Sequence, residues 1–277
     1  MSPHSIQGMQ LASPFLHRCT CCKFLLQLRY EAHFAMLLRG KGTKHVPERT
    51  QAQPILKSIL VKPAGPDCNM NCTYCFYLHK ANLFPETRIH RMSVEVLEQF
   101  ILQYMPIAGA QPSFCWQGGE PTLMGLEFFE RVVHFQMKYG LDGQAVGNSI
   151  QTNGLLIDDD WARFMHEYRF LVGVSLDGPQ EIHDYYRRDR GGHATFERVM
   201  KAIDVLRGHD VEFNILCVIN DVNVRHPDAL FQFFIEHDLR FVQFIPCVER
   251  DTQTGNIADF SVSPEAYAEF LCRAFDL

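Results

Sequence analysis

The sequence lacks the features of several large classes of protein. No uninterrupted apolar run approaches the roughly 18 residues that a membrane-spanning helix needs, so we expect no membrane protein. Basic residues do not exceed acidic ones, and the net charge of −6 argues against a nucleic-acid-binding surface as the main function. The histidines form neither a His-x3-His nor a His-Glu-x2-His pattern, so we predict no histidine zinc site.

A clear signal peptide is also missing, although the chain has ten cysteines. Three of them, Cys68, Cys72 and Cys75, lie too close together and are too odd in number for a disulfide framework. In a chain without a secretion signal, such a group more often binds a metal. We therefore expect the protein to work in a reducing compartment, the cytoplasm.

The first 50 residues differ from the rest in charge. They hold seven Lys and Arg and two acids, a charge of +5, so residues 51–277 carry −11. Cys19, Cys21 and Cys22 also lie here, at a spacing that is poor for binding one metal. We interpret residues 1–53 as a disordered or non-native extension, with a targeting segment as the alternative. Residues 54–277 then form the folded domain.

The three clustered cysteines lie in the stretch 67–77 and have the spacing Cys-x3-Cys-x2-Cys. A loop with this spacing can bring three thiolates to one centre, and thiolates suit a metal that prefers soft ligands. A structural zinc site needs four protein ligands. A cubane iron–sulfur cluster held by three cysteines leaves one iron free for a substrate or cofactor. The pattern favours this second arrangement.

From residue 55 onward, short β-rich runs alternate with longer amphipathic runs, which is typical of βα units and a parallel sheet. We predict six strands near residues 59–61, 113–116, 146–151, 170–176, 211–219 and 241–245. We predict six helices. The first begins at Ser93, the next four cover residues 126–139, 158–168, 195–207 and 225–237, and the last begins at Ser263-Pro264. Six units are too few for a closed eight-stranded barrel and indicate an open, partial one.

Polar residues follow several of these strands at their carboxyl ends, where the sites of such folds gather. Besides the cysteine loop, these segments are residues 117–120, 151–153 and 175–177. Gly118 and Gly119 allow a ligand to approach the backbone closely, and carbonyls with the Glu120 carboxylate can receive an ammonium group. An ordinary turn is the alternative interpretation of this Gly-Gly pair.

The sequence resembles the radical S-adenosylmethionine enzymes, and within them the anaerobic sulfatase-maturating enzymes. The motifs that carry the resemblance are Cys-Asn-Met-Asn-Cys-Thr-Tyr-Cys-Phe-Tyr, Trp-Gln-Gly-Gly-Glu-Pro-Thr-Leu, Gln-Thr-Asn-Gly and Ser-Leu-Asp-Gly-Pro-x-Glu-Ile-His. It extends from about Leu60 to the end of the chain. The resemblance implies an α/β fold, a partial (β/α)6 TIM-like barrel of the radical SAM type.

The resemblance also implies a chemistry. Cys68, Cys72 and Cys75 would hold a [4Fe–4S] cluster whose fourth iron takes the amine and carboxylate of S-adenosyl-L-methionine. The resulting 5′-deoxyadenosyl radical would oxidise a Cys or Ser of a sulfatase polypeptide to Cα-formylglycine. The other implied partner is a low-potential electron donor of the flavodoxin or ferredoxin type.

Further residues receive roles through the same resemblance. Tyr74 and Val248 would contact the adenine, and Ser175 and Arg187 would hold the methionine carboxylate and the ribose. The methionine end would meet a second group of residues, Gln117, Gly118, Gly119 and Glu120. Alternatives remain for three of these positions: Arg187 and Arg188 as a solvated pair, and Tyr74 and Val248 as packing residues.

The chain departs from the family at its end. Relatives continue into a cysteine-rich region that binds two auxiliary [4Fe–4S] clusters and supplies an Asp as general base, whereas this sequence stops at Leu277. We therefore expect that region to be absent, the catalytic base to lie beyond residue 277, and peptide turnover to be poor. The alternatives are another peptide-modifying radical SAM maturase and a non-catalytic, metal-binding truncated paralogue.

Four other cysteines receive structural interpretations. Cys115 and Cys217 lie in apolar strand runs and are predicted to be buried. Cys247 follows the last strand and is interpreted as a packing residue, and Cys272 lies on the last helix.

Overall fold

The computed structural model describes residues 56–251 and 253–277, and the predicted extension over residues 1–53 lies outside this part of the chain. Six strands form one sheet in which each strand pairs in parallel with its neighbours in the chain. The strands are β1 Ser58–Val61, β2 Ser113–Trp116, β3 Gly147–Thr152, β4 Leu171–Ser175, β5 Phe213–Ile219 and β6 Val242–Pro246. This open half-barrel confirms the predicted partial (β/α)6 fold.

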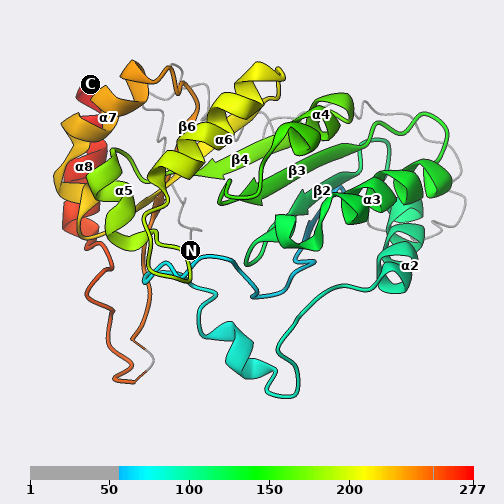
Figure 1. Ribbon diagram of the computed structural model, residues 1–277, viewed down its shortest axis with the longest axis horizontal. Helices are drawn as coiled ribbons and strands as arrows, with labels where there is room; N and C mark the ends of the chain where they lie inside the picture. Colours follow the sequence, from blue (N-terminus) through cyan, green and yellow to red (C-terminus); the bar gives the residue numbers. More distant parts are fainter. Residues whose placement is uncertain (1–55, 252) are drawn as a thin grey trace, which may run out of the picture. The chain divides into compact units, whose positions relative to one another are not determined.

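Helices connect the strands and pack against the sheet (Figure 1). They are α2 Val94–Tyr104, α3 Leu126–Tyr139, α4 Asp159–Glu167, α5 Gln180–Tyr186, α6 Phe196–Gly208, α7 Pro227–Glu236 and α8 Pro264–Asp276. The Ser93 and Ser263 hydroxyls accept hydrogen bonds from Val96 and Ala266 in the first turns of α2 and α8. Both serines are therefore N-caps, as their positions before apolar runs predict.

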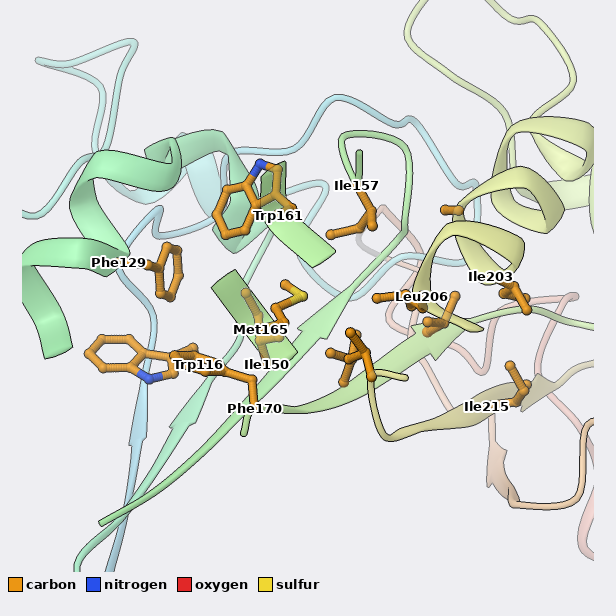
Figure 2. Close-up of a cluster of buried hydrophobic side chains, with 14 of the residues drawn as sticks. Trp116, Phe129, Ile150, Ile157, Trp161, Met165, Phe170, Ile203, Leu206 and Ile215 are labelled. Atoms are coloured by element: carbon orange, nitrogen blue, oxygen red, sulfur yellow. The ribbon is translucent and has the colours of Figure 1, made fainter. Parts of the chain in front are cut away.

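The hydrophobic core lies between the helices and one face of the sheet. Figure 2 shows Trp116 and Ile150 of the sheet beside Phe129 of α3 and Trp161 of α4. The Trp116 and Phe129 ring centroids are 5.7 Å apart in an edge-on arrangement. Each large apolar side chain buried in this way stabilises the fold by about 1.5–3 kcal/mol. The core therefore covers one face of the sheet and leaves the other face open.

The other face of the sheet is less buried and more polar. Burial alternates along β2 and β3, so Cys115, Ser149 and Gln151 point away from the core and are half-buried. Gly173 and Ser175 continue this face on β4. The interpretation of Cys115 as a buried core residue is therefore wrong, because its place in the β2 alternation puts it on the open face. Cys217 and Cys247 are buried and Cys272 is exposed.

The predicted strands and helices are all present, within a few residues of their predicted bounds. Helix α5 is the one α-helix among the described residues that the sequence analysis did not predict. Across the described part of the chain, no helix combines the length and apolarity needed to cross a bilayer.

Candidate functional site

The cysteine loop follows β1 and packs at the carboxyl edge of the sheet. Cys72 is buried, whereas Cys68 and Cys75 are half-buried. All three belong to a small second hydrophobic cluster that is separate from the main core and contains Met70, Cys72, Tyr74 and Cys247 with Cys68 and Cys75 packed against it. The sequence prediction that these thiols lie together is consistent with this cluster.

The loop after β2 holds the start of the cysteine loop through its backbone. Gly119 N–H donates to the Gly65 carbonyl at 2.8 Å, and Glu120 N–H donates to the Asp67 carbonyl at 2.7 Å. A Cβ on Gly119 would lie 2.1 Å from the Asp67 oxygen, so no other residue fits here without a backbone shift. Gly118 has φ +122°, which is a conformation that only glycine adopts easily. The Gly-Gly pair is therefore required by close backbone approach.

The connection between α5 and α6 holds the loop from the other side. Asn71 N–H donates to the Arg188 carbonyl at 2.8 Å, and the Arg190 Nε donates to the Cys68 carbonyl at 2.7 Å. On the outer side, Asp67 accepts from the His90 backbone N–H at 2.9 Å and forms an ion pair with Arg91. Three segments far apart in the sequence therefore fix the shape of the loop.

Burial disfavours the thiolate form of two of the three cysteines, Cys68 and Cys72. Burial raises the pKa of the Cys68 thiol to about 12, helped by the nearby Glu120 charge. Burial likewise raises the pKa of Cys72 to about 11, although the Arg187 guanidinium opposes this. Cationic metals release such protons because they stabilise the thiolate. A metal that binds here must therefore displace the protons of Cys68 and Cys72.

The thiols also receive hydrogen bonds that suit thiolate ligands. Met70 N–H donates to the Cys68 sulfur at 3.3 Å and Tyr77 N–H donates to the Cys75 sulfur at 3.4 Å. Within the described residues, no three His, Cys, Asp or Glu side chains are already arranged to hold a metal ion. The three unpaired thiols, supplied by one loop and given N–H donors, nevertheless form a donor set that fits an iron–sulfur cluster.

The carboxylate of Glu120 points into the protein and is fully buried. Its Oε1 accepts from the Thr122 N–H, the Thr122 hydroxyl at 2.6 Å and the Thr152 hydroxyl at 2.8 Å. Its Oε2 accepts from the Asn153 N–H at 2.7 Å. Burial raises the pKa of Glu120, and these four donors oppose the rise. The carboxylate therefore joins the loops after β2 and β3. Because it is engaged there, it is not available to an ammonium group, and only the backbone carbonyls of this segment are.

A buried charged group lies beside the cysteine loop and joins it to β4 and the residue after α5. The Tyr74 hydroxyl donates to Asp177 Oδ2 at 2.5 Å, and Arg187 Nη1 donates to the Tyr74 oxygen at 2.8 Å. Asp177 Oδ1 accepts from the Val218 N–H at 3.0 Å. Burial alone lowers the pKa of Arg187, but the neighbouring Tyr74, Cys72 and Asp177 raise it well above its ordinary value. Arg187 is thus a buried cation and not part of a solvated pair.

Arg187 is also incompletely paired. Its Nε is buried and has no hydrogen-bond partner among the described residues. Buried donors are normally satisfied, so an unpaired guanidinium nitrogen next to a polar cluster indicates a place for an acceptor. Tyr74 packs edge-on against Tyr186 with ring centroids 5.6 Å apart, so its ring is buried and its hydroxyl is engaged.

The other predicted site residues differ in exposure. Ser175 is half-buried at the end of β4, and its hydroxyl accepts from the Gln151 amide at 3.2 Å. Gln117 is half-buried at the end of β2. Val248 is 64% exposed just after β6. The structure therefore leaves Ser175, Gln117 and Val248 open to a ligand.

Two residues that the sequence analysis did not assign also contribute to the site. Asn153 donates from its amide to the Cys68 sulfur at 3.6 Å and to Asn69 Oδ1 at 2.7 Å. His183 is fully buried and receives the Asp177 N–H on Nδ1 at 3.3 Å. Both belong to motifs that carry the resemblance, Gln-Thr-Asn-Gly and Ser-Leu-Asp-Gly-Pro-x-Glu-Ile-His. These motifs were the sequence signal by which the two residues could have been found.

Comparison with known proteins gives a family for this arrangement. Residues 63–234 match the family model described as the radical SAM superfamily. A serine-type anaerobic sulfatase-maturating enzyme of Bacteroides thetaiotaomicron is 42% identical over 255 residues, which cover 85% of this chain and 59% of the relative. A cysteine-type enzyme of Clostridium perfringens is 42% identical over 220 residues, which cover 79% of this chain and 60% of the relative.

Solved structures agree with these similarities. The structure described as native anSMEcpe with bound AdoMet and Cp18Cys peptide superposes with a TM-score of 0.72 at 42% identity, covering 80% of this chain and 59% of that one. SuiB of Streptococcus suis bound to S-adenosylmethionine has a TM-score of 0.60 at 14% identity and shares the fold. The chain spans about three fifths of the length of the curated relatives it matches.

Proposed function

This chain belongs to the radical SAM superfamily, and from that premise we propose that it takes part in anaerobic sulfatase maturation. The reaction would oxidise a Cys or Ser of a sulfatase polypeptide to Cα-formylglycine. Relatives of both the serine type and the cysteine type support this assignment at the same 42% identity. They do not favour one target residue over the other.

We assign a [4Fe–4S] cluster to Cys68, Cys72 and Cys75, with S-adenosyl-L-methionine beside it. When bound, these cofactors supply one-electron chemistry in which a 5′-deoxyadenosyl radical removes a hydrogen atom from the target residue. The donor set supports the assignment, since the three thiols are unpaired and two of them receive backbone N–H groups.

The residues around the loop would bind and orient S-adenosylmethionine. Gly118 and Gly119 bring backbone close to the loop, so that carbonyls of this segment, between Gln117 and Glu120, can accept from the methionine amine. Ser175 offers a hydroxyl for the carboxylate or ribose. Val248 offers an exposed apolar surface for the adenine. Tyr74 would act indirectly, because its hydroxyl is engaged with Arg187 and Asp177.

The observation that carries the proposal is the unpaired Nε of Arg187. A buried guanidinium beside Cys72, with one nitrogen unpaired among the described residues, indicates a missing acceptor, and a carboxylate matches its planar geometry. The ligand carboxylate of S-adenosylmethionine is such an acceptor. On the basis of the likeness to the sulfatase-maturating relatives, we further propose two partners, a sulfatase polypeptide and a low-potential electron donor of the flavodoxin or ferredoxin type. A reduced cluster requires a reducing compartment, for which we propose the cytoplasm.

Anaerobic reconstitution of the chain followed by iron, zinc and sulfide analysis tests the cofactor. We expect about four irons with matching sulfide per chain, and formation of 5′-deoxyadenosine when S-adenosylmethionine and a reductant are added. Mass spectrometry of a sulfatase-derived Cys or Ser peptide then tests the reaction. Cys72→Ala removes a proposed ligand and should lose the cluster. Cys272→Ala is the matched control, because Cys272 is exposed on α8. One zinc per chain and no iron would contradict the proposal.

A further inference from the structure

We infer that Asn153, which follows β3, tunes the reduction potential of the cluster through its hydrogen bond to the Cys68 sulfur. The inference rests on the proposed function, because it requires a cluster on the cysteine loop. It assigns a role to the side chain of Asn153, to which the proposed binding of S-adenosylmethionine gives none. Asn153 is a positioning and tuning residue here, and it takes no part in the reaction itself.

Asn153 is 5% exposed, and every polar group on its side chain has a partner. Oδ1 accepts from the Leu155 N–H at 3.0 Å, which fixes the orientation of the amide. Its Nδ2 then faces the cysteine loop and donates to Asn69 Oδ1 at 2.7 Å and to the Cys68 sulfur at 3.6 Å. A flipped amide would place an oxygen against that sulfur.

The backbone of Asn153 is fixed as firmly as its side chain. Its N–H donates to Glu120 Oε2 at 2.7 Å, and Glu120 in turn donates its own N–H to the Asp67 carbonyl, one residue before Cys68. The carboxylate is fully buried and also accepts from Thr122 and Thr152. Glu120 therefore joins the backbone of Asn153 to the backbone just before Cys68, and so fixes the Asn153 amide against the Cys68 sulfur.

The three thiols differ in their surroundings because of this contact. Cys68 receives two N–H donors, from Met70 and from Asn153. Cys75 receives one, from Tyr77. Reduction adds negative charge that is shared by the thiolate sulfurs, and N–H donors stabilise this charge. The Asn153 amide therefore makes the cluster easier to reduce, and its removal lowers the potential.

The test is a redox titration of the reconstituted 277-residue chain without S-adenosylmethionine, followed by electron paramagnetic resonance. Asn153→Ala is expected to shift the reduction equilibrium about tenfold toward the oxidised form, which is a potential about 59 mV more negative. Asn153→Asp keeps an oxygen for the Leu155 N–H but presents negative charge to the sulfur, so a larger shift is expected. Asn69→Ala removes the other acceptor of the same amide, and with it an oxygen that lies 3.8 Å from the Cys68 sulfur, while the Asn153 contact to the sulfur stays. Its potential should therefore not fall below that of the wild type.

The outcomes separate the inference from the proposed function. A wild-type chain that binds no iron sinks the proposed function. A wild-type chain with a full cluster, and Asn153 variants with the wild-type potential, overturn the inference alone. An equal shift in Asn69→Ala, or loss of iron in both Asn153 variants, would show that the amide only holds the loop in shape, and would also overturn it.

Discussion

The buried carboxylate of Glu120 is the residue on which two strand-end loops depend. It is fully buried and accepts four hydrogen bonds from Thr122, Thr152 and Asn153. Glu120→Gln would set an NH2 group against at least one of these donors and leave buried polar groups unpaired. We expect the free energy of unfolding to fall by about 2–4 kcal/mol, measured by urea denaturation.

Glu127→Gln is the matched control for that change. Glu127 lies in the first turn of α3 with a 77% exposed side chain that forms an ion pair with Arg131. Its substitution should change the free energy of unfolding by no more than about 0.5 kcal/mol. Equal effects from the two substitutions would show that the Glu120 network contributes little to stability.

Glu120 also shows what a pattern can and cannot predict about a residue. The two glycines of the Gly-Gly-Glu-Pro motif predict close approach of a ligand, whereas the close approach in the structure is to the backbone of the cysteine loop. The motif does not reveal where the carboxylate points, because Thr152 and Asn153 lie some thirty residues further along the chain. The same holds for Tyr74, whose hydroxyl partners Asp177 and Arg187 lie just after β4 and just after α5. Roles that depend on distant partners became visible only in the structure.

At the scale of elements, α5 links the end of β4 to the start of α6 through His183. Asp177 N–H donates to His183 Nδ1, and Nε2 lies 3.1 Å from the Thr195 hydroxyl, which itself donates to the Arg187 carbonyl. Nδ1 therefore accepts and Nε2 carries the proton, so the imidazole is neutral. Helix α5 is short and its apolar residues are few, which is why the sequence pattern did not predict it. The six longer helices and the strands have clear periodicity and were predictable.

A pH dependence follows from the neutral state of His183. Burial, together with Arg187, lowers the pKa of His183 well below its ordinary value. Below about pH 6.5 the unfolded chain therefore binds a proton that the folded chain does not, and stability falls as the pH falls. Between about pH 7.5 and about pH 5.5, the wild type should lose about 1.4 kcal/mol more than His183→Gln in urea denaturation.

The comparison with His183→Gln removes the other titrating groups from the measurement, because both proteins share them. A wild type and a His183→Gln variant with parallel pH profiles would mean that His183 titrates normally in the folded chain.

The loop between β2 and α3 depends on the absence of a side chain at Gly119. A Cβ there would lie 2.1 Å from the Asp67 carbonyl oxygen, so Gly119→Ala must move the backbone before Cys68. We expect a loss of about 2–4 kcal/mol in the free energy of unfolding and reduced iron binding after reconstitution. Gly208→Ala at the end of α6, where a Cβ meets nothing within 4 Å, is the control. It should be neutral or stabilise the protein by up to about 1 kcal/mol.

At the scale of the whole described domain, the apolar side chains form two clusters with different tasks. The main core joins the helices to the sheet and contains none of the three cysteines of the loop. The second cluster holds Met70, Cys72, Tyr74 and Cys247 at the carboxyl edge of the sheet. The half-barrel should therefore fold without an iron–sulfur cluster, whereas the cysteine loop should become more ordered when an iron–sulfur cluster binds.

Simultaneous substitution of Cys68, Cys72 and Cys75 by alanine tests this division. Without metal, the variant should keep the wild-type circular dichroism spectrum and lose only about 1–2 kcal/mol of unfolding free energy, because small side chains are removed outside the main core. Anaerobic reconstitution should raise the melting temperature of the wild type, since a ligand that binds only the folded chain stabilises it. The variant should gain neither iron nor thermal stability. A variant that is unfolded without metal would place the cysteine loop within the folding core of the half-barrel, and the two clusters would then have to act as one.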